Sequence, residues 1–167
     1  MRHPVVTDKA PKPLGPYSQA VTDGDLIFVS GQGATNPQTG KKELGDVRTE
    51  TKRTFENLRA ILQAAGSSMD HVMKCNVYLR DINDFSAMNE VYETFFAPPF
   101  PARTTIQAGA LPGGIAVVIE CIAKKIPYWT RWTSTHPHST SISTRSSATS
   151  RKCRSGVASG ESSCDRT

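Results

Sequence analysis

Two segments of the chain repeat their hydrophobic residues every three to four positions, which is the spacing of an amphipathic helix. The first covers residues 46–66, where Asp46 is placed to cap the amino end and Gly66 to end the helix. The second starts after Asp84, another potential cap, and stops before Pro98. Its apolar stripe comprises Phe85, Met88, Tyr92 and Phe95. The pattern therefore predicts two helices, each with one face turned towards a core.

Strand patterns occupy most of the remaining chain up to residue 127. Residues 17–21 and 26–30 flank the turn sequence Asp23-Gly24, which predicts a hairpin. Residues 103–108 form a further strand candidate, and after a turn rich in Pro and Gly the chain continues into residues 115–124. We therefore expect a hairpin before the helical segments and two further strands, joined by a turn, at the end of the domain.

Residues 72–80 show the period of two that marks a half-buried strand. The elements thus follow one another in the order β-β-α-β-α-β-β, which predicts an α+β sandwich of one sheet with two helices on one face. Nothing in residues 1–127 remains to cover the second face of the sheet, so we expect oligomerisation to cover it. In the strand at 72–80, one face holds Met73, Cys75, Val77 and Leu79, and the other holds Lys74, Asn76 and Tyr78.

The composition changes sharply near Pro127. From residue 128 to 167 the chain contains 18 Ser or Thr and almost no periodic apolar pattern. We divide the chain into a domain of residues 1–127 and a Ser/Thr-rich basic tail of residues 128–167. We expect the tail to be disordered, because it cannot bury enough surface to offset its ordering entropy. Trp129 and Trp132 leave two alternatives open, docking of the tail on the domain and an out-of-frame or artificial extension.

The net charge of +5 would suggest a nucleic-acid partner if it belonged to the domain. The tail accounts for +4 of it, with six basic and two acidic residues, whereas residues 1–127 contain 14 basic and 13 acidic residues, or +1. We therefore expect no DNA or RNA partner for the domain. Residues 108–123 form the longest apolar stretch, which is too short and too interrupted to span a bilayer, so no membrane partner is expected.

The four cysteines show neither the spacing of a zinc site nor that of a disulfide framework. The four histidines form no metal-ligand pattern, and the nucleophile-elbow, P-loop, dinucleotide and zinc-protease motifs are missing. We therefore expect no metal site. The first residues lack the apolar core of a secretory leader, so the expected location is the reducing cytoplasm, with a mitochondrial location left open.

Arg103 and Glu120 are the charged residues with the most unusual positions. Arg103 opens a strand of uncharged residues, where its guanidinium is either a two-armed grip for a carboxylate or an exposed or ion-paired edge residue. Glu120 interrupts an apolar run, where a carboxylate needs a partner or a cleft. It is either ion-paired with a Lys or Arg or an acid or water-orienting group. The glycine-rich segment 30–33 is either a turn or a backbone site for a small anion.

Several short motifs, in order over residues 5–125, closely resemble the RidA/YjgF family of reactive-intermediate deaminases. Their number and spacing make the resemblance specific, and the tail lies outside it. The motifs are Gly15-Pro16-Tyr17-Ser18-Gln19-Ala20, Ser30-Gly31-Gln32, Asn36-Pro37-Gln38-Thr39-Gly40, the helix end 57–66, Asn83-Asp84-Phe85, Asn89-Glu90-Val91-Tyr92, Pro101-Ala102-Arg103 and Ile119-Glu120-Cys121-Ile122-Ala123.

The resemblance implies a chorismate-mutase-like fold and a homotrimer with three clefts between subunits. It also implies hydrolysis of 2-imino or enamino acids, such as 2-iminobutanoate and 2-iminopropanoate, to 2-oxo acids and ammonia without a cofactor. Arg103 would bind the substrate carboxylate, helped by backbone N–H groups near Gly31 and Thr105. Further cleft residues would be Tyr17, Ser30 and Asn89, whose alternative readings are an interface aromatic for Tyr17 and a surface amide for Asn89.

The chain departs from the family pattern at two positions. Thr105 stands where many relatives have a cysteine. Family members usually have two glutamates two positions apart on the last strand, and the first of them, thought to position the attacking water, aligns with Val118. Glu120 matches only the second, roughly 6 to 7 Å along the strand. Two other functions therefore stay open: a carboxylate-binding or chaperone-like trimer, and a ribonuclease or translation inhibitor.

Overall fold

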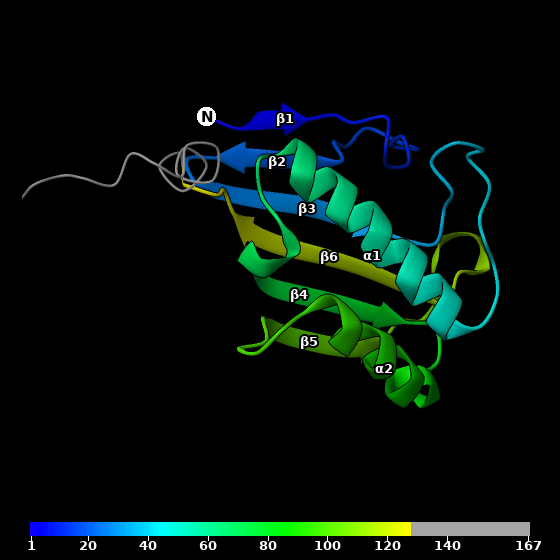
Figure 1. Cartoon of the computed structure of the whole chain (residues 1–167). Helices are drawn as coiled ribbons and strands as arrows, with labels where there is room; N and C mark the ends of the chain where they lie inside the picture. Colours follow the sequence, from blue (N-terminus) through cyan, green and yellow to red (C-terminus); the bar gives the residue numbers. More distant parts are fainter. Residues whose placement is uncertain (128–167) are drawn as a thin grey trace, which may run out of the picture.

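Strands with one buried and one open face build a single sheet in residues 1–127, the part of the chain that the computed structural model describes (Figure 1). Their order across the sheet is β1-β2-β3-β6-β4-β5, and every neighbouring pair is antiparallel except β4 and β5. The expectation of a disordered tail lies outside the described residues. The strands are β1 (His3–Val5), β2 (Ala20–Asp23), β3 (Leu26–Gln32), β4 (Val72–Leu79), β5 (Ala102–Gln107) and β6 (Val117–Lys124).

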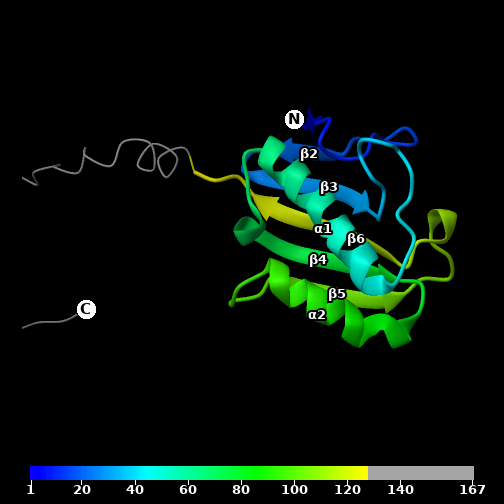
Figure 2. The same cartoon turned by 45° about the vertical axis from the view of Figure 1, so that its right-hand side comes forward.

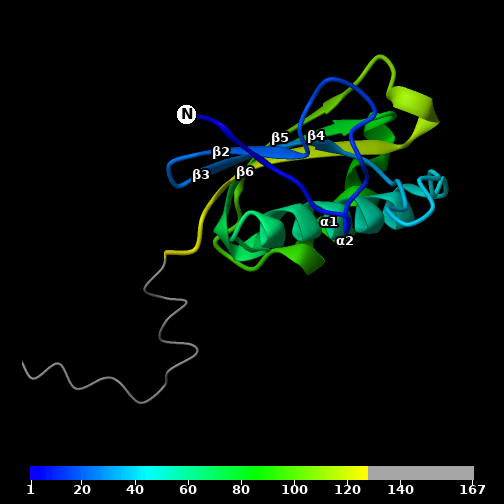
Figure 3. The ribbon, with the colours of Figure 1, turned by 90° about the horizontal axis from the view of Figure 1, so that it is seen from above.

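Two helices, α1 (Val47–Ala64) and α2 (Phe85–Phe95), cover the same face of this sheet (Figure 2). The view from above shows α1 and α2 below the sheet and neither of them on its other side (Figure 3). We call that other side the open face. The predicted α+β sandwich, one sheet with two helices on one face, is thus confirmed. Short 3₁₀ turns at Met69–His71, Ile82–Asp84 and Pro112–Gly114 connect the elements.

Phe55 of α1 joins the two helices at the centre of the core. Its ring is fully buried and stacks on Phe95 with ring centroids 4.8 Å apart. Tyr92 and Phe96 approach it edge-on at 5.5 Å. On the side of the sheet that the helices cover, β3, β4 and β6 contribute buried side chains to the core, such as Ile27, Leu79 and Ile119. This packing fixes α2 against the start of β5, where Arg103 lies.

Three boundaries differ from the sequence expectation. β1 was not predicted, because three residues that include Pro4 give no periodic signal; Pro4 is tolerated since β1 is an edge strand. β2 begins at Ala20 instead of residue 17, so Tyr17 precedes the sheet. The segment 30–33 is no turn: β3 continues to Gln32 through a register shift between Val29 and Gln32.

Of the two predicted helix caps one makes the expected hydrogen bond and the other does not, and the predicted facing of Met73 is wrong. Asp46 caps α1 as predicted, since its Oδ1 accepts the N–H of Thr49 at 2.8 Å. The cap predicted at Asp84 is wrong, because its side chain makes no capping bond. Met73 was placed on the buried face but is 52% exposed, because a register shift between Val72 and Lys74 puts Val72 in the inward position.

Buried polar side chains hold the loops at one end of the sheet. Asn57 of α1 donates through Nδ2 to the carbonyls of Gly33 and Thr35, at 3.0 and 2.9 Å. Glu50, about two turns earlier and 1% exposed, accepts the N–H of Ala116 at 2.6 Å and that of Gly45 at 3.2 Å. α1 therefore fixes both the segment after β3 and the entrance to β6.

We expect Glu50→Gln to lower the free energy of unfolding by about 1–3 kcal/mol, because an amide offers one acceptor oxygen where the carboxylate supplies two, and one buried N–H loses its partner. Urea unfolding of the purified protein measures the change. Lys52→Gln, on the exposed side of the same helix, is the matched control and should stay within about 0.5 kcal/mol of the parent. Equal stability of Glu50→Gln and the parent would contradict this account.

Candidate functional site

Arg103, the second residue of β5, is half-buried on the helix-covered side of the sheet. Its register partner on β4 is Cys75, whose side chain is also turned inwards. The guanidinium lies over the Tyr92 ring at 4.5 Å from the centroid and near the Phe85 ring at 5.4 Å. Within residues 1–127 its side chain makes no ion pair and no hydrogen bond. The planar cation is thus held by aromatic rings with its donors free.

A cavity of about 260 Å³ opens at Arg103. Three buried oxygen atoms of this strand and helix have no hydrogen-bond partner among the described residues: Asn89 Oδ1, Tyr92 Oη and Thr105 Oγ1. Buried polar atoms without partners are uncommon and call for an explanation such as a ligand or water. A guanidinium next to such acceptors suits a small molecule that has both a carboxylate and an N–H group. The cavity is lined by Asn89, Tyr92, Glu93, Phe100, Pro101 and Arg103.

The Cys75 thiol near Arg103 is not poised for nucleophilic chemistry. Burial raises the pKa of Cys75 to about 11, although Tyr92 and the positive charge of Arg103 act in the opposite direction. Burial likewise raises the pKa of Tyr92. Both groups therefore stay protonated near neutral pH, and the thiol lacks the thiolate form that attacks substrates.

A second group of predicted site residues lies at β3 and in the segment before β2, and comprises Tyr17, Ser30 and Gly31. Ser30 Oγ donates to the carbonyl of Ser18 at 2.7 Å, which fastens β3 to the segment before β2. Tyr17 is 50% exposed, and its hydroxyl accepts the N–H of Leu14 at 3.2 Å. A Cβ on Gly31 would lie 2.9 Å from Val118 Cγ1, so the strand approaches β6 too closely for a side chain there.

Tyr17 and Gly31 line a larger cavity of about 700 Å³. Its walls come from the segment before β2, the loop between β3 and α1, and the loop before β6. Lys42 spans two of these loops, since its Nζ donates to the carbonyl of Pro112 at 2.8 Å. Val118 and Tyr78 form part of the floor on the open face.

Glu120 lies on the open face and is half-buried. The ion pair with Lys or Arg, one of the two alternatives for Glu120, does not form among the described residues: Glu120 Oε1 accepts instead from Asn76 Nδ2 at 2.9 Å and from the Tyr78 hydroxyl at 3.0 Å. The hydrogen bond to Glu120 raises the pKa of Tyr78. Two neutral donors therefore hold this carboxylate in place.

The predicted site residues form two groups that do not meet within one chain. Asn89, Arg103 and Thr105, which we call the arginine half-site, lie at β5 and α2 under the helix-covered side. Tyr17, Ser30 and Gly31, the glycine half-site, lie at β3, with β6 and β4 between them and β5. Glu120 faces away from the helices, so it lies on the opposite face from Arg103. A single chain cannot place both catalytic candidates around one substrate.

Sequence reasoning did not find the aromatic support of Arg103 or the role of Tyr78. The alternation in residues 72–80 placed Tyr78 on the polar face correctly. Its bond to Glu120 depends on the pairing of β4 with β6, which are separated by some forty residues of chain. Only a prediction of strand order could have revealed it.

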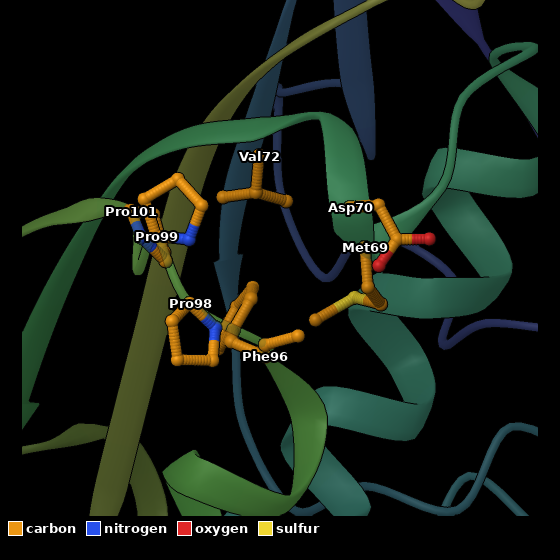
Figure 4. Close-up of a pocket in the computed structure, with 8 residues that line it drawn as sticks. Met69, Asp70, Val72, Phe96, Pro98, Pro99 and Pro101 are labelled. Carbon is orange, nitrogen blue, oxygen red and sulfur yellow. The ribbon is translucent and has the colours of Figure 1, made fainter.

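A further cavity of about 260 Å³ lies between the Met69–His71 turn and the segment after α2 (Figure 4). Its walls are mainly apolar side chains, among them Met69, Val72 and Phe96 together with three prolines. Asp70 is the sole charged lining residue, and its carboxylate points away from the prolines in the close-up. This hollow offers no pair of groups for acid–base or nucleophilic chemistry.

In the described part of the chain, no three His, Cys, Asp or Glu side chains gather as a metal site would require. No helix of residues 1–127 is long and apolar enough to cross a membrane. The fold and the two half-sites thus define a small α+β domain with an unpaired arginine suited to a small carboxylate.

Comparison with known proteins extends this description. A family model described as Endoribonuclease L-PSP matches residues 7–125. A RutC family protein of Pyrococcus abyssi is 48% identical over 121 residues, which cover 72% of this chain and 95% of that protein. The 2-iminobutanoate/2-iminopropanoate deaminase of Mus musculus is 44% identical over 128 residues, 77% of this chain and 95% of that protein.

Solved structures give the same result. The crystal structure of Escherichia coli TdcF with bound serine is 38% identical, with a TM-score of 0.70, and the match covers 74% of this chain and 99% of that one. The chain belongs to the RidA/YjgF family, whose family model spans nearly all of the described residues.

We expect iodoacetamide at pH 8 to leave Cys75 unmodified in the folded protein, because burial excludes the reagent and the raised pKa disfavours the thiolate. Protein unfolded in urea is the control, in which Cys75 should react readily. Mass spectrometry of tryptic peptides distinguishes Cys75 from the other cysteines. Equal labelling rates in the folded and unfolded protein would show that this side of Arg103 is open.

Proposed function

We propose that the protein hydrolyses 2-imino and enamino acids, such as 2-iminobutanoate and 2-iminopropanoate, to 2-oxo acids and ammonia. The observation that supports this most is Arg103: a half-buried guanidinium that makes no ion pair or hydrogen bond within residues 1–127, at a cavity beside the unpartnered Asn89 Oδ1. The deaminase name of the mouse relative and the serine bound to TdcF agree with a small substrate that has a carboxylate and a nitrogen.

The chemistry needs little beyond positioning. The two arms of the Arg103 guanidinium bind the substrate carboxylate, and Asn89 Oδ1 accepts an N–H of the imine. An imine carbon is already electrophilic, so a held water adds to it and gives a carbinolamine. The C–N bond then breaks as the C=O bond forms, and ammonia leaves.

The two half-sites combine if a second chain brings its Gly31 to the Arg103 of the first. The open face supports association, because Leu26, Phe28 and Ile106 are 39%, 41% and 48% exposed on it. Exposed apolar patches of this kind mark interaction surfaces. We propose a homotrimer in which neighbouring chains build each cleft, in line with the family resemblance.

A trimer that binds carboxylates without hydrolysing imines is the competing function, because Val118 lacks a carboxylate. The described residues contain 14 basic and 13 acidic side chains, so they give no electrostatic support to RNA cleavage despite the description of the family model.

We expect Arg103→Ala to lower kcat/KM for 2-iminobutanoate by about 100-fold, because the loss of a charge-assisted contact costs about 3 kcal/mol. The imine is generated in the assay by an amino-acid oxidase, and semicarbazide traps what the enzyme leaves. Arg59→Ala is the matched control, since Arg59 also lies over a ring, Phe95 at 4.9 Å, but lines neither the cavity at Arg103 nor the 700 Å³ cavity. Equal rates for Arg103→Ala and the parent would place the site elsewhere.

The shared cleft predicts complementation between two inactive variants. In trimers mixed at random from Arg103→Ala and Gly31→Val chains, roughly a quarter of the clefts receive both intact half-sites, and activity should return to about that fraction. Native mass spectrometry checks that the mixed trimers form. Tyr17→Ala replaces Gly31→Val if the latter fails to fold. Mixed trimers without activity would mean that one chain supplies both half-sites, and a stable monomer would contradict the assembly.

A further inference from the structure

Tyr78 reaches the position where the family's water-orienting glutamate is missing. It is the cross-strand partner of Val118 in the pairing of β4 with β6, and both side chains face away from the helices. Directly opposed side chains in a sheet lie within about 5.5 Å of one another at Cβ. Tyr78 also lines the 700 Å³ cavity together with Gly31 and Val118. The phenol therefore stands next to the place that a carboxylate at position 118 would occupy.

The Tyr78 hydroxyl connects this place to the nearest carboxylate. Its O–H donates to Glu120 Oε1 at 3.0 Å, and Asn76 Nδ2 donates to the same oxygen at 2.9 Å. Because the phenol proton is directed to Glu120, the lone pairs of the phenol oxygen remain available to another donor. A water in the cavity is such a donor.

We propose that Tyr78 and Glu120 together take the proton of the attacking water, in place of the glutamate that relatives have at the position of Val118. This inference rests on the proposed imine hydrolysis. Tyr78 is the catalytic residue, because it contacts the water, and Glu120 is a positioning residue and proton acceptor that acts through it.

The proton transfers balance for a protonated imine. The water oxygen bonds to the imine carbon, the electron pair of the C=N bond moves to nitrogen, and the water proton passes to the Tyr78 oxygen while Tyr78 gives its own proton to Glu120. The product is a neutral carbinolamine. Glu120 then returns the proton through Tyr78 to the nitrogen, the C–N bond breaks, and the carbinol O–H proton leaves with ammonia as ammonium.

Two features of the open face favour this arrangement. Gly31 has no side chain to displace Val118, where a Cβ would come within 2.9 Å of Val118 Cγ1, so Val118 keeps its place opposite Tyr78. The hydrogen bond to Glu120 also raises the pKa of Tyr78, which keeps the phenol protonated near neutral pH. The proton transfer from the water through Tyr78 to Glu120, which we call the relay, therefore has the phenol donor that it requires.

The test combines Tyr78→Phe and Glu120→Gln with a rescue. Each single variant should lower kcat for 2-iminobutanoate by roughly 100-fold or more, the size of a typical acid–base contribution, with little change in KM. Adding Val118→Glu to Tyr78→Phe should restore at least a tenth of the parent rate, since it returns a carboxylate to the family position. Lys74→Gln, on the same face of β4, is the control and should keep the parent rate.

The outcomes separate the relay from the proposed function. Thermal unfolding and binding of the product 2-oxobutanoate should be unchanged in Tyr78→Phe, which excludes a folding defect as the cause of a slow rate. Parent activity together with a fast Tyr78→Phe variant overturns the relay and leaves imine hydrolysis intact. A slow Tyr78→Phe variant that Val118→Glu fails to rescue also overturns it. A parent without imine hydrolysis overturns both proposals.

Discussion

The two-residue alternation of strand side chains, with helices on one face of the sheet only, decides where each residue of the domain acts. Cys75 and Val77 turn inwards and build the core, whereas Asn76 and Tyr78 between them turn to the open face. Arg103 and Glu120 are divided by the same rule. The sheet is thus both the wall of the core and the barrier between the two halves of the candidate site.

The site depends equally on α1, which contains no candidate catalytic residue. Asn57 and Glu50 project from its buried side to the backbone of the loops around the large cavity, and each bond satisfies a polar group that could not otherwise be buried. Gln19 does the same for the first segment of the chain, with bonds to the carbonyls of Thr7, Ala10 and Pro11. The loops owe their positions to these side chains more than to their own sequences.

The sequence predicted features that depend on neighbouring residues and missed features that depend on residues far apart in the chain. α1, α2 and the alternation in β4 were predictable because their periodicity is local, and the N-cap at Asp46 is read from adjacent residues. The segment 30–33 was misread because glycine is common to turns and to bulged strands. Arg103 contacts α2, and Tyr78 contacts Glu120, because segments far apart in the chain pack together. The spacing of residues along the sequence does not predict such contacts.

The loop between β3 and α1 is fastened to α1 near both ends, and hydrogen bonds within the loop hold its tip, where Asn36 Oδ1 accepts the N–H groups of Gln38 and Thr39 at 2.9 and 3.2 Å. Asn57 fixes Gly33 and Thr35, Glu50 fixes Gly45, and a Cβ on Gly40 at the tip would meet nothing within 4 Å. Residues 37–40 nevertheless line the large cavity. The tip is thus a preformed part of the cavity wall, and Gly40, whose φ is 68°, has a left-handed conformation that a residue with a side chain would adopt only under strain, although nothing crowds it.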